Sequence, residues 1–79
     1  MPPQLAYRRL NPAKLLLSKW TAARPSNREK HFLVTKLFEP DEAGSGIEWV
    51  EIEAIHSRRC ERIAWRELCD GSRWLQGWK

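Results

Sequence analysis

Five tryptophans in a chain of only 79 residues are the feature that most limits how this protein can fold. A chain of this length has room for one domain with a single core, which rarely supplies more than about 3–5 kcal/mol of net stability. A tryptophan buries roughly 150–250 Å² of surface when it packs. We therefore expect most of the rings to lie in the core, with Trp20 and Trp65 the most buried. Trp49, Trp74 and Trp78 should retain some exposure.

Two apolar segments predict the centre of a β-sheet. His31–Glu39 is rich in Phe, Val, Thr and Leu, and strict alternation places Phe38 on the same face as Phe32. Ile47–His56 alternates aliphatic residues with glutamates. Because Pro40–Gly46 between them has the composition of a turn, the two segments should pair as an antiparallel hairpin.

The other predicted elements are shorter. We expect two short strands at Ser18–Ala23 and Cys60–Trp65, and helical turns at Pro12–Leu17, Trp65–Cys69 and Ser72–Gln76. Arg24–Asn27 has the composition of a loop. The side chains expected in the core are Trp20, Val50, Ile52, Ile63 and Trp65.

These elements predict a mainly β fold, α+β at most. The alternatives are a small SH3-like barrel and a twisted antiparallel meander of roughly three to five short strands, with short helical turns near both termini. Residues 1–10 should form a flexible basic lead-in, and residues 11–79 a single tryptophan-rich domain. No apolar run reaches the length of a membrane-spanning helix, so we expect no membrane partner.

The cysteines and histidines do not form a recognisable catalytic or metal site. His31, His56, Cys60 and Cys69 are separated by 25, 4 and 9 residues, which matches no standard zinc pattern. No phosphate-binding glycine loop or nucleophile motif is present. We therefore expect reduced thiols in a cytoplasmic protein that is not an enzyme, has no metal or cofactor, and has no identified small-molecule substrate.

The charge is unevenly distributed along the chain. Residues 1–30 carry seven Lys or Arg against one acidic residue, residues 31–55 carry one against six, and residues 56–79 carry six against three. The basic ends either form a face for an anionic partner or neutralise the acidic middle as neighbouring strands. The residues that could contact nucleic acid or another partner are Lys19, Arg24, Arg28, Lys30, Arg58, Arg59, Arg66, Trp74 and Trp78.

Several ordered blocks of the sequence resemble a known family. They are Asn11–Leu15, Ser18–Ala22, Glu29–Phe32, Trp65–Leu68 and Arg73–Trp78. Together they resemble the small tryptophan-rich proteins of cyanobacteria and some proteobacteria, a family without an established function. The similarity covers about residues 10–79. Trp20, Trp65, Trp74 and Trp78 fall on the motif positions of the family, whereas Trp49 and the two cysteines do not. It implies a bacterial cytosolic setting and supplies no catalytic residue and no ligand.

Two functions follow as hypotheses. The first is a non-catalytic module that binds nucleic acid, RNA above all, through basic residues and exposed tryptophans. The second is a protein–protein adaptor or small subunit of a larger assembly, which docks through the C-terminal segment that carries Trp74 and Trp78. We expect Trp74 to pack as part of the core, and Trp78 to close a sheet edge or remain half exposed as a contact ring.

Overall fold

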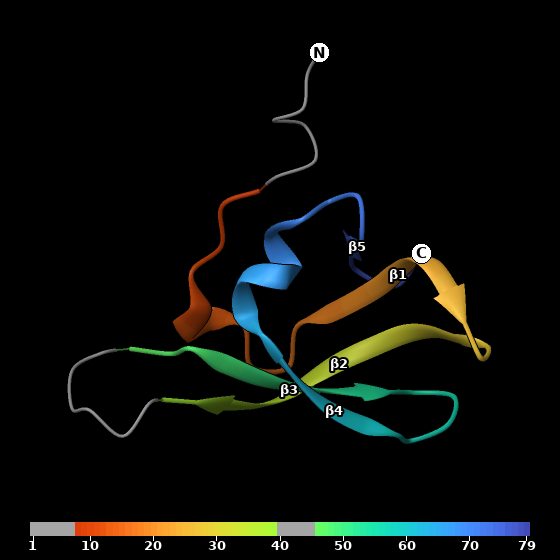
Figure 1. Ribbon diagram of the computed structural model, residues 1–79, viewed down its shortest axis with the longest axis horizontal. Coiled ribbons are helices and arrows are strands. Elements are labelled where there is room, and N and C mark those ends of the chain that lie inside the picture. The colour runs from red at the N-terminus through yellow and green to blue at the C-terminus, as the bar shows by residue number, and fades with distance from the viewer. Residues whose placement is uncertain (1–7, 40–45) are drawn as a thin grey trace, which may run out of the picture.

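The computed structural model of the chain describes residues 8–39 and 46–79. Five strands form one open antiparallel sheet in the order β4-β3-β2-β1-β5 (Figure 1). The strands are β1 (Lys19–Ser26), β2 (Glu29–Phe38), β3 (Trp49–Ala54), β4 (Cys60–Ala64) and β5 (Trp74–Gln76). The predicted mainly β fold is confirmed, and its described strands form a meander-like sheet that does not close into a barrel.

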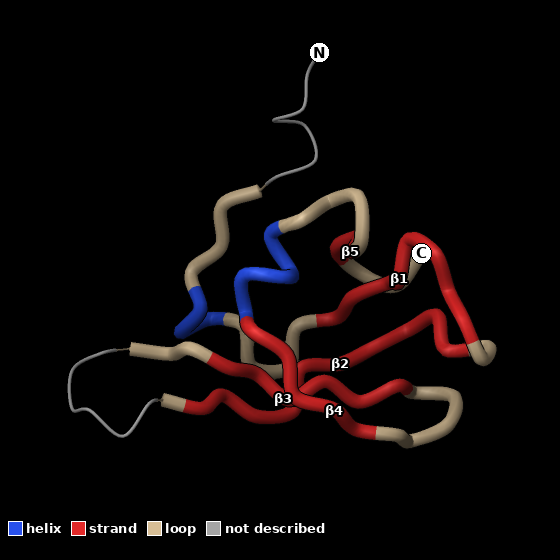
Figure 2. Tube along the Cα trace, viewed as in Figure 1, coloured by secondary structure: helices blue, strands red, loops and turns tan. Residues whose placement is uncertain are grey.

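Two short 3-10 helices, η2 (Pro12–Lys14) and η3 (Trp65–Cys69), lie on one side of this sheet (Figure 2). Asn11 caps η2, because its side-chain oxygen accepts a hydrogen bond from the backbone N–H of Ala13 at 3.0 Å. Neither helix has both the length and the apolarity to cross a membrane, in the part of the chain that the structure describes.

The predicted hairpin of the two long segments is confirmed, since β2 pairs with β3 from Phe32↔Ala54 to Phe38↔Trp49. The register shifts by one residue between Val34 and Lys36. This bulge overturns the expectation that Phe38 shares a face with Phe32, because after it Leu37 packs against the core instead. Of the predicted turn, Pro40 to Ser45 lie outside the described residues.

The sequence prediction was wrong at two other places. Arg24–Asn27 is not a loop: β1 continues to Ser26, and only Asn27 and Arg28 make the turn into β2. Ser72–Gln76 is not a helical turn, because Trp74 begins strand β5, which pairs with β1. Ladder hydrogen bonds to a neighbouring strand outweigh the weak helical tendency of so short a segment.

The core lies between the sheet and the two helices. Trp20, Val50 and Ile52 are fully buried and Ile63 nearly so, as predicted, while Trp65 is only partly buried. Phe32 and Trp74 meet edge to face, with ring centroids 5.1 Å apart. Other buried members of the core are Leu15, Val34, Ala54 and Leu68.

Arg8 fastens the N-terminal segment to the rest of the domain. Its backbone N–H donates to the carbonyl of Cys69 at 2.7 Å, and its guanidinium donates to the carbonyls of Leu68 and Trp74. The guanidinium also lies 5.3 Å from the ring centroid of Trp20. Arg8, inside the range predicted to be a flexible lead-in, therefore contacts η3, β5 and the fully buried Trp20.

Candidate nucleic-acid interface

Most of the predicted cationic contacts gather at one end of the sheet. Arg24, Arg28 and Lys30 belong to the β1–β2 hairpin, and Arg58 and Arg59 belong to the β3–β4 turn, which lies at the same end (Figure 1). We call this set of five residues the basic end. All five are exposed. Within the described residues, Arg24, Arg28 and Lys30 form no ion pair.

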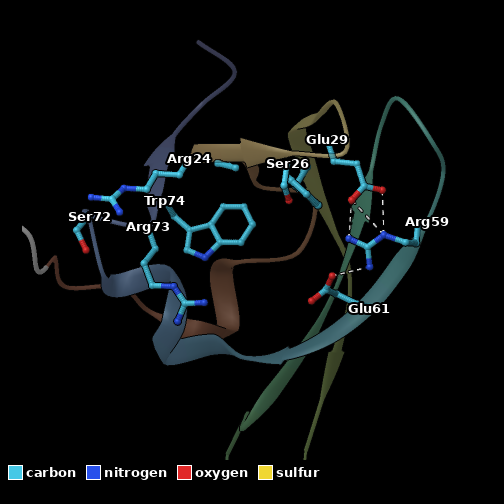
Figure 3. A pocket seen from close by; sticks show the side chains of 10 residues that line it. Arg24, Ser26, Glu29, Arg59, Glu61, Ser72, Arg73 and Trp74 are labelled. Carbon is cyan, nitrogen blue, oxygen red and sulfur yellow. Dashed lines mark hydrogen bonds and ion pairs between the residues drawn. The ribbon is translucent and has the colours of Figure 1, made fainter.

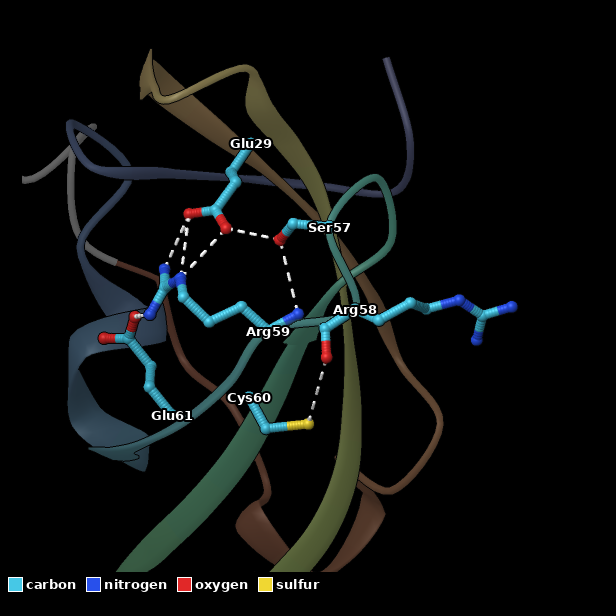
Figure 4. A network of polar contacts seen from close by, with 6 residues as sticks. All are labelled: Glu29, Ser57, Arg58, Arg59, Cys60 and Glu61. Carbon is cyan, nitrogen blue, oxygen red and sulfur yellow. Dashed lines mark hydrogen bonds and ion pairs between the residues drawn. The ribbon is translucent and has the colours of Figure 1, made fainter.

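Arg59 is held in place by two carboxylates, as Figure 4 shows. Its Nη2 donates to Glu29 Oε1 at 2.7 Å, and its Nη1 donates to Glu61 Oε1 at 2.6 Å. Ser57 donates a further hydrogen bond to Glu29. Hydrogen bonds from Arg59 and then Ser57 lower the pKa of Glu29 to about 2. The network joins the beginning of β2 to the β3–β4 turn and so fixes the two parts of the basic end relative to each other.

Two arginines of the basic end have backbone conformations that favour glycine. Arg28 has φ of 63° and Arg58 has φ of 64°, both in the left-handed region. A residue with a Cβ atom loses about 1–2 kcal/mol there. Asn27, with φ of 55°, completes the left-handed pair that a two-residue hairpin turn of this type requires. The chain therefore carries cationic side chains at two turn positions where glycine would be less strained.

A pocket of about 500 Å³ adjoins the basic end on the core side of the sheet. It lies where the open sheet leaves β5 and β4 unjoined, with the Trp74 ring on one side and the Glu29–Arg59–Glu61 group on the other (Figure 3). Arg24 and Arg73 line it as well. The volume falls within the range of about 300–1,000 Å³ that small-ligand sites occupy. We call it the seam pocket.

Trp78 lies on the opposite face of the sheet. Its ring stands 5.8 Å from the ring of His31, centroid to centroid, and Lys19 Nζ lies 4.8 Å from the Trp78 ring centroid. The Trp78 indole N–H donates to the carbonyl of Phe32 at 2.9 Å. The side chain remains 42% exposed. With its indole N–H anchored and much of the side chain exposed, Trp78 is a candidate ring for contact with a planar ligand.

Three predicted contacts lie elsewhere or have another role. Trp74 is 9% exposed, which confirms the prediction that it packs in the core and contradicts the expectation that it keeps some exposure as a contact residue. Arg66 lies on η3, away from the basic end, with its guanidinium 5.3 Å from the Trp65 ring centroid. Lys19 belongs to the Trp78 face. Trp49, which we expected to keep some exposure, is 40% exposed.

Sequence reasoning missed Arg8, Arg9 and Arg73 as site residues. Arg73 lines the seam pocket, whereas Arg8 and Arg9 line a second hollow beside η3. Arg73 could have been predicted from the sequence, because it directly precedes Trp74 in the basic C-terminal third of the chain. Nothing local identified Arg8, whose partners lie 60 and 66 residues away.

The thiols lie apart and carry no paired chemistry. Cys60 is exposed and Cys69 is buried. Desolvation raises the pKa of both thiols, and at Cys60 the charges of Glu51 and Glu53 raise the pKa further. No group of three or more His, Cys, Asp or Glu side chains within residues 8–39 and 46–79 is arranged to hold a metal ion.

Comparison with known proteins identifies one similarity. A family model described as "Tryptophan-rich protein (DUF2389)" matches residues 18–79, which include every strand, η3 and all five tryptophans. No curated protein and no solved structure matches the chain.

Proposed function

The chain belongs to the tryptophan-rich family DUF2389, and from this premise we propose that it is a non-catalytic module that binds single-stranded nucleic acid, RNA above all, at the basic end of its sheet. The family description states no activity, so the support comes from the site itself. A bacterial cytoplasmic setting is part of the same proposal.

One observation carries the proposal: Arg28 occupies a strained, left-handed turn position, is exposed, and has no ion pair in the described chain. An arginine there contributes less to stability than glycine would. Strain of this kind is typical of functional positions. Arg24 and Lys30 stand on the same hairpin with their charges equally free, so the hairpin presents three cations to a polyanion.

The surroundings of the basic end favour a single strand over a duplex. The seam pocket shares Arg24 and Arg59 with the basic end and has room for one unstacked base. On the other face, Trp78 offers a ring on which a base can stack. Phosphates would lie along Arg24, Arg28 and Lys30, between these two positions.

The decisive experiment compares glycine substitutions at three left-handed positions. Arg28→Gly should leave the free energy of unfolding unchanged or raise it by up to about 1 kcal/mol, because glycine relieves the strain. Arg58→Gly relieves the same strain but loses the exposed ion pair of Arg58 with Glu53 at 3.1 Å, so its free energy of unfolding should change little. Both should weaken binding to a mixed-sequence RNA oligonucleotide. Leu17→Gly is the matched control: Leu17 has φ of 66° and an exposed side chain but carries no charge. It should not change RNA affinity.

Salt dependence provides the second measurement. Removal of one cation that binds a phosphate of the single strand should reduce the slope of log affinity against log salt by about 0.7. The double variant Arg28→Gln/Lys30→Gln should therefore lower the slope by about 1.4. The control variant Lys14→Gln/Lys36→Gln removes the same amount of charge, from η2 and from the middle of β2. It should leave the slope unchanged. Equal reductions in both double variants would mean that only net charge matters, and no binding at about 50 mM salt would end the proposal.

A protein partner is the second candidate, favoured by the exposure of Leu75 and Trp78 at the C-terminal edge of the sheet. Affinity capture from lysate separates the two functions. Capture of a stoichiometric protein that survives nuclease treatment would favour the adaptor, whereas loss of all captured material on nuclease treatment would favour nucleic acid.

A further inference from the structure

A second hollow, of about 310 Å³, lies beside η3 and shares no lining residue with the seam pocket. The N-terminal segment and η3 run side by side there, held by the bond from the Arg8 N–H to the Cys69 carbonyl (Figure 1). Its lining residues are Arg8, Arg9, Leu10, Trp65, Arg66 and Cys69. Three of the six are arginines and none is acidic. We call it the arginine pocket.

The charge of Arg8 is fixed in this pocket and is not neutralised there. Its guanidinium donates to two main-chain carbonyls, those of Leu68 and Trp74, the second at 2.7 Å. Carbonyl oxygens satisfy the donors but leave the positive charge uncompensated. The contact with the Trp20 ring restrains the guanidinium further. Arg8 is therefore a preorganised cation.

Arg66 and Arg9 add two further charges. Arg66 lies against the Trp65 ring, and this contact orients its guanidinium without removing its charge. None of the three arginines forms an ion pair within the described residues. The seven residues before Arg8 contain no acidic side chain. Asp70, directly after η3, is the next acidic residue along the chain from Glu67, and its carboxylate accepts two hydrogen bonds from Ser72.

The arginine pocket and the seam pocket differ in how far their arginines are neutralised, and this difference indicates the kind of ligand that each could bind. In the seam pocket, Arg59 is neutralised by Glu29 and Glu61, and Arg73 lies 3.5 Å from Glu67. The lining of the arginine pocket contains three arginines and no acidic residue, and such an excess of positive charge attracts an anion. Guanidinium groups match the oxygen geometry of phosphate and bind it through paired hydrogen bonds.

We propose that the arginine pocket binds a phosphate dianion, either free phosphate or the terminal phosphate of a larger molecule. Arg8 supplies a fixed positive charge in the pocket lining, and Arg66 on η3 and Arg9 on the N-terminal segment supply the guanidinium groups that bind the ligand. This site is separate from the basic end, and its existence does not depend on RNA binding.

The test is a titration of the full-length ¹⁵N-labelled protein with inorganic phosphate, at constant ionic strength set with chloride. Saturable shifts should occur at the Trp65 indole N–H and at the amides of Leu10 and Arg66. Arg66→Gln should weaken phosphate binding about tenfold, as expected for the loss of charge-assisted hydrogen bonds. Arg9→Gln should weaken it as well, and because Arg9 is exposed that variant should fold normally.

Arg62→Gln is the matched control, because Arg62 also lies over an aromatic ring, 4.3 Å from the Phe38 centroid, but on the face away from the core. It should bind phosphate like the wild type. Equal effects of Arg62→Gln and Arg66→Gln, or shifts that spread over all basic residues without saturation, would overturn the proposal.

The source of the phosphate is resolved with two RNA oligonucleotides that differ only in a 5′-phosphate. Preference for the phosphorylated strand, lost in Arg66→Gln, would assign the site to a strand end. Phosphate binding without that preference would assign it to free phosphate or a small phosphate ester. Arg28→Gln/Lys30→Gln should weaken RNA binding and leave the phosphate titration unchanged, so failure of either proposal can be recognised independently of the other.

Discussion

Glu29 and Arg59 bind each other across 30 residues of sequence, with Arg59 Nε donating to both carboxylate oxygens at 3.1 and 2.9 Å and Nη2 donating to one of them at 2.7 Å. The Glu29 residue is only 5% exposed, which is unusual for a glutamate in so small a domain. The pair is the main polar link between the start of β2 and the β3–β4 turn.

The stability that Glu29 provides should depend on pH. Because its pKa is lowered to about 2 in the folded chain, mainly by hydrogen bonds from Arg59, its ionised form stabilises the fold above the unfolded pKa of about 4.3. That stabilisation is lost as pH falls from about 4.3 towards 2. The melting temperature of Glu29→Gln should therefore lie well below the wild type at pH 6 and approach it near pH 2. Glu39→Gln, at an exposed position after β2, should follow the wild type throughout. A gap for Glu29→Gln that is the same at both pH values would contradict the prediction.

Trp74 and Trp78 should differ in their effect on stability. Trp74→Ala removes a core ring that packs on Phe32, and it should lower the free energy of unfolding by about 3–5 kcal/mol. Trp78→Ala removes a half-exposed ring with one hydrogen bond and should lower it less. Chemical denaturation followed by circular dichroism measures both. An unchanged midpoint for Trp74→Ala would show that β5 does not belong to the cooperative unit. If Trp78 is the stacking ring, Trp78→Ala should also weaken RNA binding more than Trp49→Ala does.

Substitution of Gly77 should destabilise the domain because of the backbone conformation at this position alone. It has φ of 82°, and an added Cβ would meet no atom within 4 Å. Gly77→Ala should therefore cost about 1–2 kcal/mol of stability through backbone strain alone. The same variant should disturb the Trp78 indole N–H resonance, because the bend at Gly77 directs Trp78 onto the outer face. Gly46 also has positive φ and open space, so Gly46→Ala is the control: it should show the loss of stability without the change at Trp78.

Arg8 should be needed for stability although it lies near the chain terminus. Arg8→Ala removes charge-assisted hydrogen bonds to two carbonyls and a contact with Trp20, so a loss of about 2 kcal/mol is expected. Arg9→Ala, at the adjacent exposed position, should have little effect. Thermal unfolding of the two variants provides the comparison. Equal stability would show that the Arg8 contacts contribute nothing to the fold.

The parts of the fold that depend on alternation were predictable from the sequence. The β2–β3 hairpin and the burial of Val50 and Ile52 follow from a period of two. The bulge at Thr35 was not predictable, because no local residue requires it. Its hydroxyl donates to Glu51 Oε2 at 2.7 Å, and this contact exists only when β3 lies alongside.

The same limit applies to the candidate sites. The cations of the β1–β2 hairpin were identified from composition, but their convergence with Arg58 and Arg59 needed the tertiary link to Glu29. The arginine pocket was harder still to predict from the sequence, because Arg8 and Arg66 come together only where η3 packs against the N-terminal segment. Sequence patterns predict which residues share a face of one strand, and not which distant segments will meet.

The strand order determines which parts of the sheet can form during translation. β1 is synthesised early, yet its outer neighbour β5 consists of residues 74–76, so one edge of β1 stays unpaired until those residues have emerged from the ribosome. The three hairpins from β1 to β4 involve near neighbours and can form as they emerge, whereas the Trp20↔Gln76 pairing cannot. Emergence of residues 74–76 therefore supplies this edge strand, and a translation product truncated before Trp74 would retain the hairpins while leaving an apolar, unpaired strand edge open to other chains.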